Sequence, residues 1–378
     1  MTGNPGIAWT LLSFLLVIGP LVFIHEMGHY LVGRWFGVKA DAFSIGFGRE
    51  IAGWTDKRGT RWKVGWLPLG GYVRFAGDMN AASEPSREWL ELPPEERERT
   101  FQAKPVWQRF LIVLAGPATN LIFALLVLTG FVMAYGEPRT PPLVAKVIAG
   151  SAAEQAGLRA GDRITAIDSS PVARYEDIGR LIVLRANEIV RVSYTRDGRS
   201  FTVEARPKVK NEKDEFGNEF SRGVLGVERV KQPVIEPVPL VQAVPTAARQ
   251  IWYIVSASIE GVGQIIAGTR SVSELGGPVK IAKYSGEQAS LGPVAFLWFI
   301  AVISINLGFI NLLPIPLLDG GHLFFYTVEA IRRKPLKPEA QEWAFRTGLA
   351  VLLALMVFVT LNDLSSFGLW SKLGGLIG

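Results

Sequence analysis

The stretch FIHEMGHYLV, residues 23–32, places two histidines and a glutamate at the end of an uncharged segment. The eighteen residues from Ile7 to Ile24 carry no charge. A helix needs about 20 apolar residues to cross the hydrocarbon core of a bilayer, which is about 30 Å thick. Ionisable groups inside such a span are costly and are functional by default. The stretch therefore predicts a membrane span that carries a polar site near one end.

Three further stretches of the 378-residue chain are long and nearly uncharged. Together with the first, at about 7–32, they lie at about 107–135, 292–318 and 344–361. The first stretch lacks the basic start and the small-residue cleavage site of a signal peptide, so we expect it to be a permanent span. The sequence thus predicts a multi-pass α-helical membrane protein with four transmembrane helices. Because the chain has no cysteine, disulfides and thiolate metal sites are excluded.

Lysine and arginine are distributed asymmetrically around these spans. Residues 1–24 contain neither, and only Lys372 follows the last span. Basic loops favour the cytoplasmic side, so both termini and the long segment 136–291 are predicted to lie outside. These loops also account for the net charge of +6 without a nucleic-acid site. Their basic residues are Arg34, Lys39, Arg49, Lys57, Arg58, Arg61, Lys63, Arg74, Arg97, Arg99, Lys104 and Arg109 in the first, and Arg332, Arg333, Lys334 and Lys337 in the second.

The segment IWYIVSASIEGVGQIIAG, residues 251–268, is apolar enough to raise the question of a fifth span. Glu260 lies near its centre. A charged side chain at mid-bilayer costs about 2.5–3.5 kcal/mol on insertion scales. We therefore predict a helix that lies on the outer membrane surface and does not cross.

His25 and His29 are four residues apart, so a helix places both side chains on one face, where they can bind one metal ion. Glu26 is adjacent and is placed to act on a water bound to that metal. This H-E-x-x-H pattern is typical of zinc metalloproteases, in which the glutamate is the general base. The alternative is a pair of interfacial histidines beside a solvated glutamate. It is disfavoured because three ionisable groups would be buried together at high cost.

The third and last histidine of the chain, His322, ends the stretch NLLPIPLLDGGH at residues 311–322. A catalytic zinc site has three protein ligands and one open position, so the third ligand is expected here, as Asp319 or His322. If 251–268 does not cross, the third span runs from outside to inside. Asp319 is then predicted at the inner end of that span, level with the two histidines. The four-span topology and the metal site therefore support each other.

Asn306 and Asn311 are polar residues in the third predicted span. Either can donate a hydrogen bond to a substrate carbonyl or to the oxyanion that forms from it. The alternative is a hydrogen bond to a neighbouring helix. Asn311 is the stronger candidate because it is nearer to Asp319. The predicted reaction is peptide hydrolysis, in which Glu26 takes a proton from water and returns it to the leaving amine.

Five stretches carry a resemblance to a known family: FIHEMGHYLVGRWFGVKADAFSIGFG, LPLGGYVRFAGD, LAGPATNLIFA, GGPVKIAKYSG and SINLGFINLLPIPLLDGGH. The chain resembles the site-2 proteases, and among them the bacterial RseP-like regulators of the envelope stress response. The resemblance implies that His25, His29 and Asp319 bind one Zn²⁺ and that Glu26 is the catalytic base. It also implies a substrate in the bacterial inner membrane: a transmembrane segment of a single-pass protein, often an anti-sigma factor already cut by another protease.

Residues 43–75 show strand-like alternation on both sides of a turn at DKRG, residues 56–59. The resemblance implies a membrane-inserted β-structure in this region. An exposed edge of such a hairpin is suited to pair with an extended substrate strand. The alternative is a cytoplasmic hairpin that only covers the inner face, and the sequence favours neither.

Residues 140–228 predict a compact α/β module. The stretch PPLVAKVIAGSAAEQAGLRAGDRITAIDSSPV, residues 141–172, contains a strand, a short helix at 151–158, a turn and a second strand. It resembles a PDZ domain of the bacterial protease type, which binds extended peptides along a strand. RseP-like relatives often carry two such domains, but this chain shows one signal. The predicted regions are 1–135 with two spans and the hairpin, 136–230 with the extracytoplasmic PDZ domain, 231–291 with a Pro-rich connector and surface helix, and 292–378 with the last two spans.

Two other functions fit parts of this pattern. A non-catalytic membrane scaffold would present the PDZ domain beside a vestigial metal site, and Glu26→Gln would not affect it. A metal transporter would carry polar groups along several spans. Here the polar groups lie at one depth in two spans, which disfavours transport. The sequence favours an intramembrane zinc protease whose termini and PDZ domain lie on the periplasmic side.

Overall fold

The structure, a computed structural model, describes residues 6–77, 92–183, 185–213, 219–230, 234–267, 276–334, 336 and 338–366. It divides into two compact units, which are described separately. Unit 1 comprises Met1–Leu128, Ala247–Glu260 and Leu275–Gly378, and unit 2 comprises Thr129–Thr246 and Gly261–Glu274. Parts of the predicted connector (231–233 and 268–275), Lys337 and the end of the last predicted region (367–378, with Lys372) lie outside the described residues.

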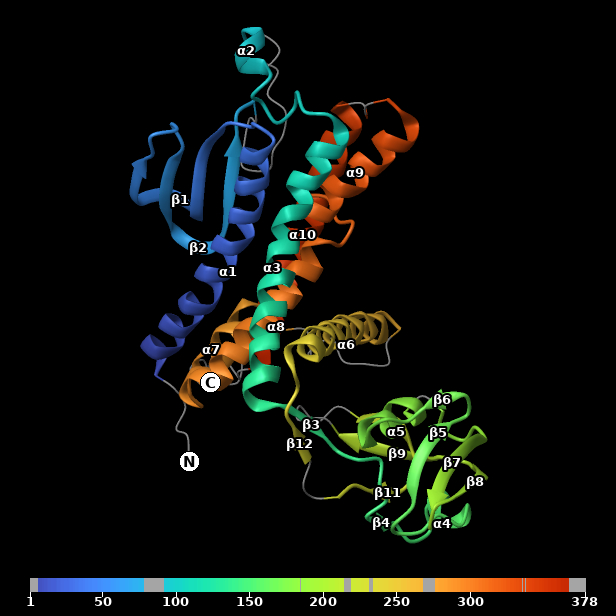
Figure 1. Cartoon of the computed structure of the whole chain (residues 1–378). Helices are drawn as coiled ribbons and strands as arrows, with labels where there is room; N and C mark the ends of the chain where they lie inside the picture. Colours follow the sequence, from blue (N-terminus) through green and yellow to red (C-terminus); the bar gives the residue numbers. More distant parts are fainter. Residues whose placement is uncertain are drawn as a thin grey trace, which may run out of the picture. The chain divides into compact units, whose positions relative to one another are not determined.

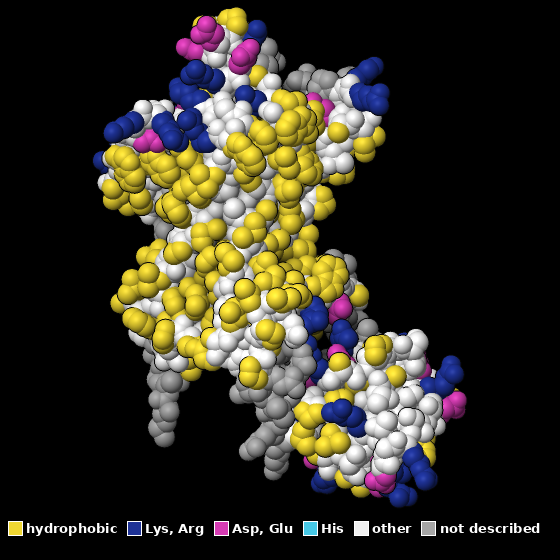
Figure 2. All heavy atoms as spheres, viewed as in Figure 1, with side chains coloured by type: hydrophobic (Ala, Val, Ile, Leu, Met, Phe, Trp, Pro, Cys, Tyr) yellow, Lys and Arg dark blue, Asp and Glu magenta, His cyan; other side chains and the backbone are white. Residues whose placement is uncertain are grey.

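Four helices are long and apolar enough to cross a membrane, as predicted. At most 39% of the apolar window of any of these helices is buried, so most of its side chains face outward, as lipid contact requires. Hydrophobic side chains cover the middle of unit 1 (Figure 2). The four helices are α1 (Ile7–Trp35), α3 (Val106–Tyr135), α8 (Pro293–Asn311) and α10 (Pro338–Ser366).

The third span is shorter than predicted. It ends at Asn311, residues 312–318 are not helical, and a separate helix, α9 (Asp319–Arg332), follows. Pro314 and Pro316 explain the break, because proline lacks the backbone N–H that a continuing helix needs. Asp319 is therefore the first residue of α9, and not the last residue of a long span. Figure 1 shows α9 continuing beyond α8 alongside α3.

The predicted surface helix is longer than expected. It begins at Leu240 and ends at Ile266 as α6, so the last part of the predicted Pro-rich connector is helical. Pro245 is tolerated because it lies in the second turn and removes a single backbone hydrogen bond. Within unit 1, Ile251, Ile254 and Val255 of α6 pack against α3 and α8. Among the described helices, α6 is not one of the candidate spans, and its surface location remains a prediction.

The predicted hairpin forms, but each of its strands is also bent on itself. In the antiparallel pair β1 (Ala40–Thr55) and β2 (Arg61–Phe75), residues 42–45 pair with 71–74 on one side and with 61–64 on the other. Residues 50–55 of β1 pair with 61–65 alone. Gly46 and Gly48, with φ of 86° and 81°, permit the bend in β1. The segments of the sheet therefore lie in the order 50–55, 61–65, 42–45 and 71–75. This order leaves residues 50–55 and 71–75 at the two edges of the sheet.

The hairpin turn is held by one carboxylate. Asp56 accepts hydrogen bonds from the backbone N–H groups of Arg58 and Thr60 and from the indole N–H of Trp62. The Trp62 hydrogen bond lowers the pKa of Asp56 below its ordinary value, because it favours the charged form. The turn lies at the predicted DKRG position.

Unit 2 contains the predicted α/β module. The strand, helix and strand of the prediction are β4 (Lys146–Val147), α4 (Ala152–Gln155) and β5 (Arg163–Ile167). A four-stranded sheet has its strands in the order β6 (Ser170–Pro171), β5, β7 (Val190–Arg196) and β8 (Arg199–Ala205). This sheet and the helix α5 (Tyr175–Ile182) enclose a core that includes Ile164 and Val192. The remaining elements among the described residues are α2 (Pro94–Arg97), β3 (Glu137–Arg139), β9 (Lys208–Lys213), β10 (Glu219–Val224), β11 (Val227–Glu228), β12 (Val234–Glu236) and α7 (Pro278–Ser290).

Candidate metal centre

The H-E-x-x-H residues lie in the C-terminal half of α1, which is helical throughout. His25, Glu26 and His29 are each only 8% exposed. A Cβ at Gly28 would lie 2.6 Å from the hydroxyl oxygen of Thr119, so glycine lets α3 approach α1 closely at this level. The Thr119 hydroxyl makes a 3.0 Å hydrogen bond to the Ile24 carbonyl and joins the two helices. The histidines are thus held between helices and not in open loops.

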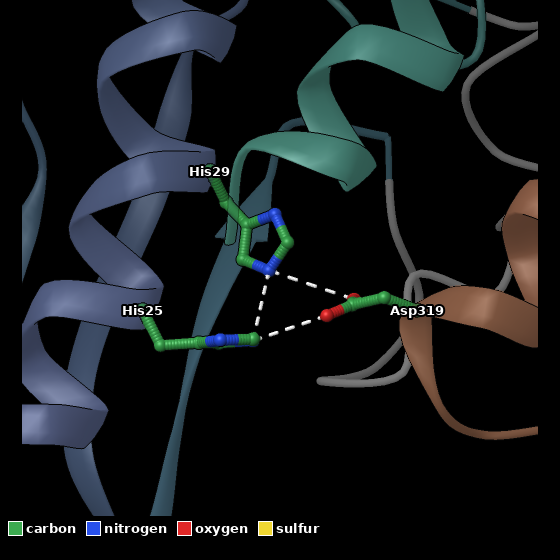
Figure 3. A group of neighbouring side chains, drawn as sticks. All are labelled: His25, His29 and Asp319. Atoms are coloured by element: carbon green, nitrogen blue, oxygen red, sulfur yellow. Dashed lines mark hydrogen bonds and ion pairs between the residues drawn. The ribbon is translucent and has the colours of Figure 1, made fainter. Parts of the chain in front are cut away.

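Asp319 meets both histidines. Its Oδ2 lies 3.1 Å from Nε2 of His25 and its Oδ1 lies 3.5 Å from Nε2 of His29. The two Nε2 atoms are 3.3 Å apart. Figure 3 shows the three side chains converging from α1 and from the start of α9. Among the described residues, these three form the group of side chains able to hold a metal ion.

Two glycines bring Asp319 to this position. A Cβ at Gly321 would lie 2.5 Å from the Ile315 carbonyl oxygen, and a Cβ at Gly320 would overlap the carbonyls of Leu312 and Leu313. Glycine at both positions therefore lets residues 312–318 fold tightly against the start of α9. The N-terminus of a helix carries partial positive charge, which favours a carboxylate such as Asp319 in the first turn.

The donor set fits zinc. Bonds of about 2.0–2.1 Å to a tetrahedral ion imply ligand atoms about 3.3 Å apart, which matches the separations above. Oδ2 of Asp319 is buried and, despite its closeness to His25, has no hydrogen-bond partner among the described residues. Buried polar atoms are normally paired, so this oxygen is suited to a metal. Two imidazoles and one carboxylate leave one position of a tetrahedron open, as catalytic zinc sites require.

Helix α3 packs against both histidine rings and contacts each of them at Nδ1. Nδ1 of His29 donates to the Ile112 carbonyl at 2.9 Å, and the amide of Asn120 lies 3.2 Å from Nδ1 of His25. A Cβ at Gly116 would clash with the His29 ring. The sequence reasoning assigned no role to these three residues of α3. A polar residue inside an apolar span, such as Asn120, was the available signal.

Glu26 lies beside the edge segment of β2. The backbone of Val73 lies next to its carboxylate. A Cβ at Gly71 would lie 3.0 Å from Cγ of Glu26, so the absence of a side chain at Gly71 lets the strand approach. The predicted base is thus placed between the metal-type cluster and a sheet edge.

The other predicted residues do not belong to this group of three side chains. The Asn306 side chain accepts a hydrogen bond from Ser258 of α6 and donates to the Val302 carbonyl. Asn311 is the last residue of α8 and, in the described part of the chain, makes no hydrogen bond to the clustered side chains. The ring of His322 lies 5.0 Å from that of Phe345, outside the three-residue group. Substrate binding by Asn306 and Asn311 therefore remains a prediction.

Comparison with known proteins identifies the family. Residues 13–355 match Peptidase family M50. The chain belongs to this family. A relative from Rhizobium meliloti (strain 1021), whose name contains the words zinc metalloprotease, is 42% identical and covers 94% of this chain and 96% of its own. Metalloprotease MmpA of Caulobacter vibrioides is 38% identical over 97% of this chain and 98% of its own. A solved PDZ domain of an SdrC-like protein from Listeria monocytogenes covers 25% of this chain and 90% of its own, with 20% identity and a TM-score of 0.19.

The family membership confirms the resemblance to the site-2 proteases. The M50 protein is a metalloprotease with zinc as its cofactor, and it is a membrane protein that acts within the lipid bilayer. The scaffold and transporter alternatives lose their support, because relatives that match nearly the whole chain are named as metalloproteases.

Proposed function

We propose that this M50 protease cleaves a peptide bond within the transmembrane segment of a single-pass membrane protein. The observation that carries the proposal is the buried convergence of His25, His29 and Asp319 at the end of an apolar span. A site at this depth is suited to a substrate that reaches it through the bilayer. The resemblance to the RseP-like proteases favours an anti-sigma factor already trimmed by another protease as the substrate, and its cleavage would signal envelope stress.

The roles of the residues follow from their positions. His25, His29 and Asp319 would hold one Zn²⁺ per chain, and zinc lowers the pKa of a bound water and polarises a carbonyl. Glu26 would accept the proton of the attacking water and then deliver it to the leaving nitrogen of the cut peptide bond. The neighbouring Val73 backbone would orient the Glu26 carboxylate for this transfer. Asn311, and secondarily Asn306, would bind the substrate carbonyl.

The edge of β2 is a suitable template for the substrate. A helical peptide bond is shielded by its own hydrogen bonds, so the segment must become extended before it is cut. Residues 71–75 lie at the sheet edge beside Glu26, and an extended strand can add to such an edge. This arrangement would place one substrate peptide bond near the base.

The hairpin is suited to enter the membrane from the cytoplasmic side. Ile51, Trp54 and Trp66 are 69%, 60% and 62% exposed, so a broad apolar face is uncovered. Figure 2 shows hydrophobic side chains over one part of this hairpin and Lys and Arg side chains next to them. Such a division between apolar and basic surfaces fits a sheet that dips into the lipid and keeps its turn in the cytoplasm.

The topology proposed for the inner membrane has both termini and the PDZ-like module on the periplasmic side. The group of His25, His29 and Asp319 brings the C-terminal half of α1 next to the segment that follows the C-terminus of α8. Parallel directions for α1 and α8 require one crossing between them, by α3, and none by α6. The topology is consistent with the regions 1–135, 136–230, 231–291 and 292–378. In this arrangement the module of 136–230 would act as a filter that excludes bulky ectodomains.

Co-expression with candidate single-pass substrates tests the proposal. The wild-type chain should shorten a substrate whose ectodomain has been trimmed, and Glu26→Gln should leave it intact while the protein remains in the membrane. Cleavage of equal extent by Glu26→Gln would show that the proposed base is not the catalyst.

A further inference from the structure

The two histidines of the cluster are held in different ways at the ring nitrogen that faces away from Asp319. Nε2 of each ring points to the cluster, so a ring that binds a metal through Nε2 must carry its proton on Nδ1. For His29 the Ile112 carbonyl enforces this, because a carbonyl can only accept a hydrogen bond. For His25 the partner is the Asn120 amide, which can either donate or accept.

Asn120 is fully buried and firmly placed. Its side chain lies 3.2 Å from Nδ1 of His25, and its backbone carbonyl accepts a 2.9 Å hydrogen bond from Ser304 of α8. The hydroxyl of Thr119, the preceding residue, donates a hydrogen bond to the carbonyl of Ile24, which is next to His25 in the sequence. Helix α3 thus fixes the amide between α1 and α8.

Internal hydrogen bonding does not choose the orientation of this amide. With the nitrogen toward His25, Oδ1 has no partner among the described residues. If the amide is turned so that Oδ1 faces His25, Nδ2 lies where Oδ1 had been and is the atom without a partner among the described residues. The tautomer that His25 needs for metal binding determines the orientation of the amide. An amide N–H directed at Nδ1 would place the ring proton on Nε2, and Nε2 could then not bind the metal.

We propose that Asn120 is a positioning residue whose side-chain oxygen accepts the Nδ1–H of His25 and so presents Nε2 to the zinc ion. The proposal rests on the metal site of the proposed function. Partners of this kind fix the tautomer and ring orientation of metal-binding histidines, and their loss typically weakens metal binding about 10- to 100-fold. Asn120 itself touches neither metal nor substrate.

Two substitutions of Asn120 by residues of similar size test whether its side chain must accept a hydrogen bond from His25. Asn120→Asp can only accept at neutral pH once ionised, and Asn120→Leu can do neither. The readout is the zinc dissociation constant of the purified full-length protein in detergent, measured by chelator competition. We expect Asn120→Asp to bind zinc within a few-fold of wild type and Asn120→Leu to bind about 10- to 100-fold more weakly. Thr129→Val, also on α3 but away from the histidines, is the matched control and should match wild type.

Wild-type affinity in Asn120→Leu would overturn the proposal, and so would an equal loss in Asn120→Asp and Asn120→Leu. His25→Ala is measured alongside: if it also binds zinc like wild type, the metal site itself is wrong, which is a separate failure. Thermal unfolding of the zinc-stripped proteins shows whether the variants fold. If Asn120→Leu does not fold, Asn120→Ala replaces it with the same expected loss.

Discussion

Gly116→Ala should damage the metal centre although it replaces none of the proposed ligands. A Cβ at this position would lie 2.9 Å from Cδ2 of the His29 ring and closer still to Nε2 and Cε1. Ordinary contacts begin near 3.4 Å, so the ring must move by at least several tenths of an ångström. Metal–ligand distances tolerate only about 0.2 Å. Overpacking of this kind costs about 1–3 kcal/mol. The ring can relieve the clash by leaving the position from which Nε2 would meet the metal, so we expect the cost to appear as a roughly 5- to 150-fold weaker zinc affinity.

The assay is the zinc dissociation constant of the purified protein, followed by cleavage of a single-pass substrate. Gly130→Ala is the matched control, because it lies on the same helix and a Cβ there would meet nothing within 4 Å. The control should bind zinc like wild type. If Gly116→Ala did so too, His29 could not occupy the position described for it, and the ligand geometry would be wrong.

The remaining predictions concern the ligands, the module, the topology and the hairpin turn. Asp319→Ala should abolish cleavage and lose zinc while His322→Ala keeps both, and metal analysis of the purified variants showing the reverse would exchange their roles. Deleting residues 140–228 should increase cleavage of a substrate that retains its large ectodomain; a folded but inactive deletion would refute the filter. Single cysteines at Ser256 and Gln288 should react with a membrane-impermeant thiol reagent added from outside, whereas one at Lys334 should not, and protection at Gln288 with labelling at Lys334 would mean that α6 crosses. Because the folded-state pKa of Asp56 is lowered, its carboxylate stabilises the hairpin turn above pH about 4 and stops doing so as the pH falls through the lowered value; Asp56→Ala should raise hydrogen exchange at the Arg58 and Thr60 amides at neutral pH, and unchanged exchange would contradict this.

Local patterns explain what the sequence could predict. The apolar runs define the four spans, and the i, i+4 spacing of His25 and His29 places both on one face of α1. These features depend on residues a few positions apart, where helix geometry is fixed. A third ligand within residues 311–322 was also predictable, because a zinc site needs one; the residues left Asp319 and His322 as candidates, and the family resemblance selected Asp319, which clusters with the histidines.

Long-range contacts explain what the sequence could not predict. The roles of Gly116, Asn120 and the Ile112 carbonyl depend on how α3 packs against α1, and no local pattern encodes that packing. The double pairing of residues 42–45 likewise depends on bends at glycines in two strands. The end of α8 was misjudged because the apolar run continues to Leu318, although Pro314 and Pro316 already signalled the break.

The most direct test of the central claim is the position of the cut. Purified protein and a trimmed single-pass substrate would be reconstituted together in lipid vesicles, and the products would be identified by mass spectrometry. The account predicts a cut between two residues of the apolar segment of the substrate by the wild-type chain, and no product from Glu26→Gln. A cut only in the soluble part of the substrate, or the same products from Glu26→Gln, would contradict it.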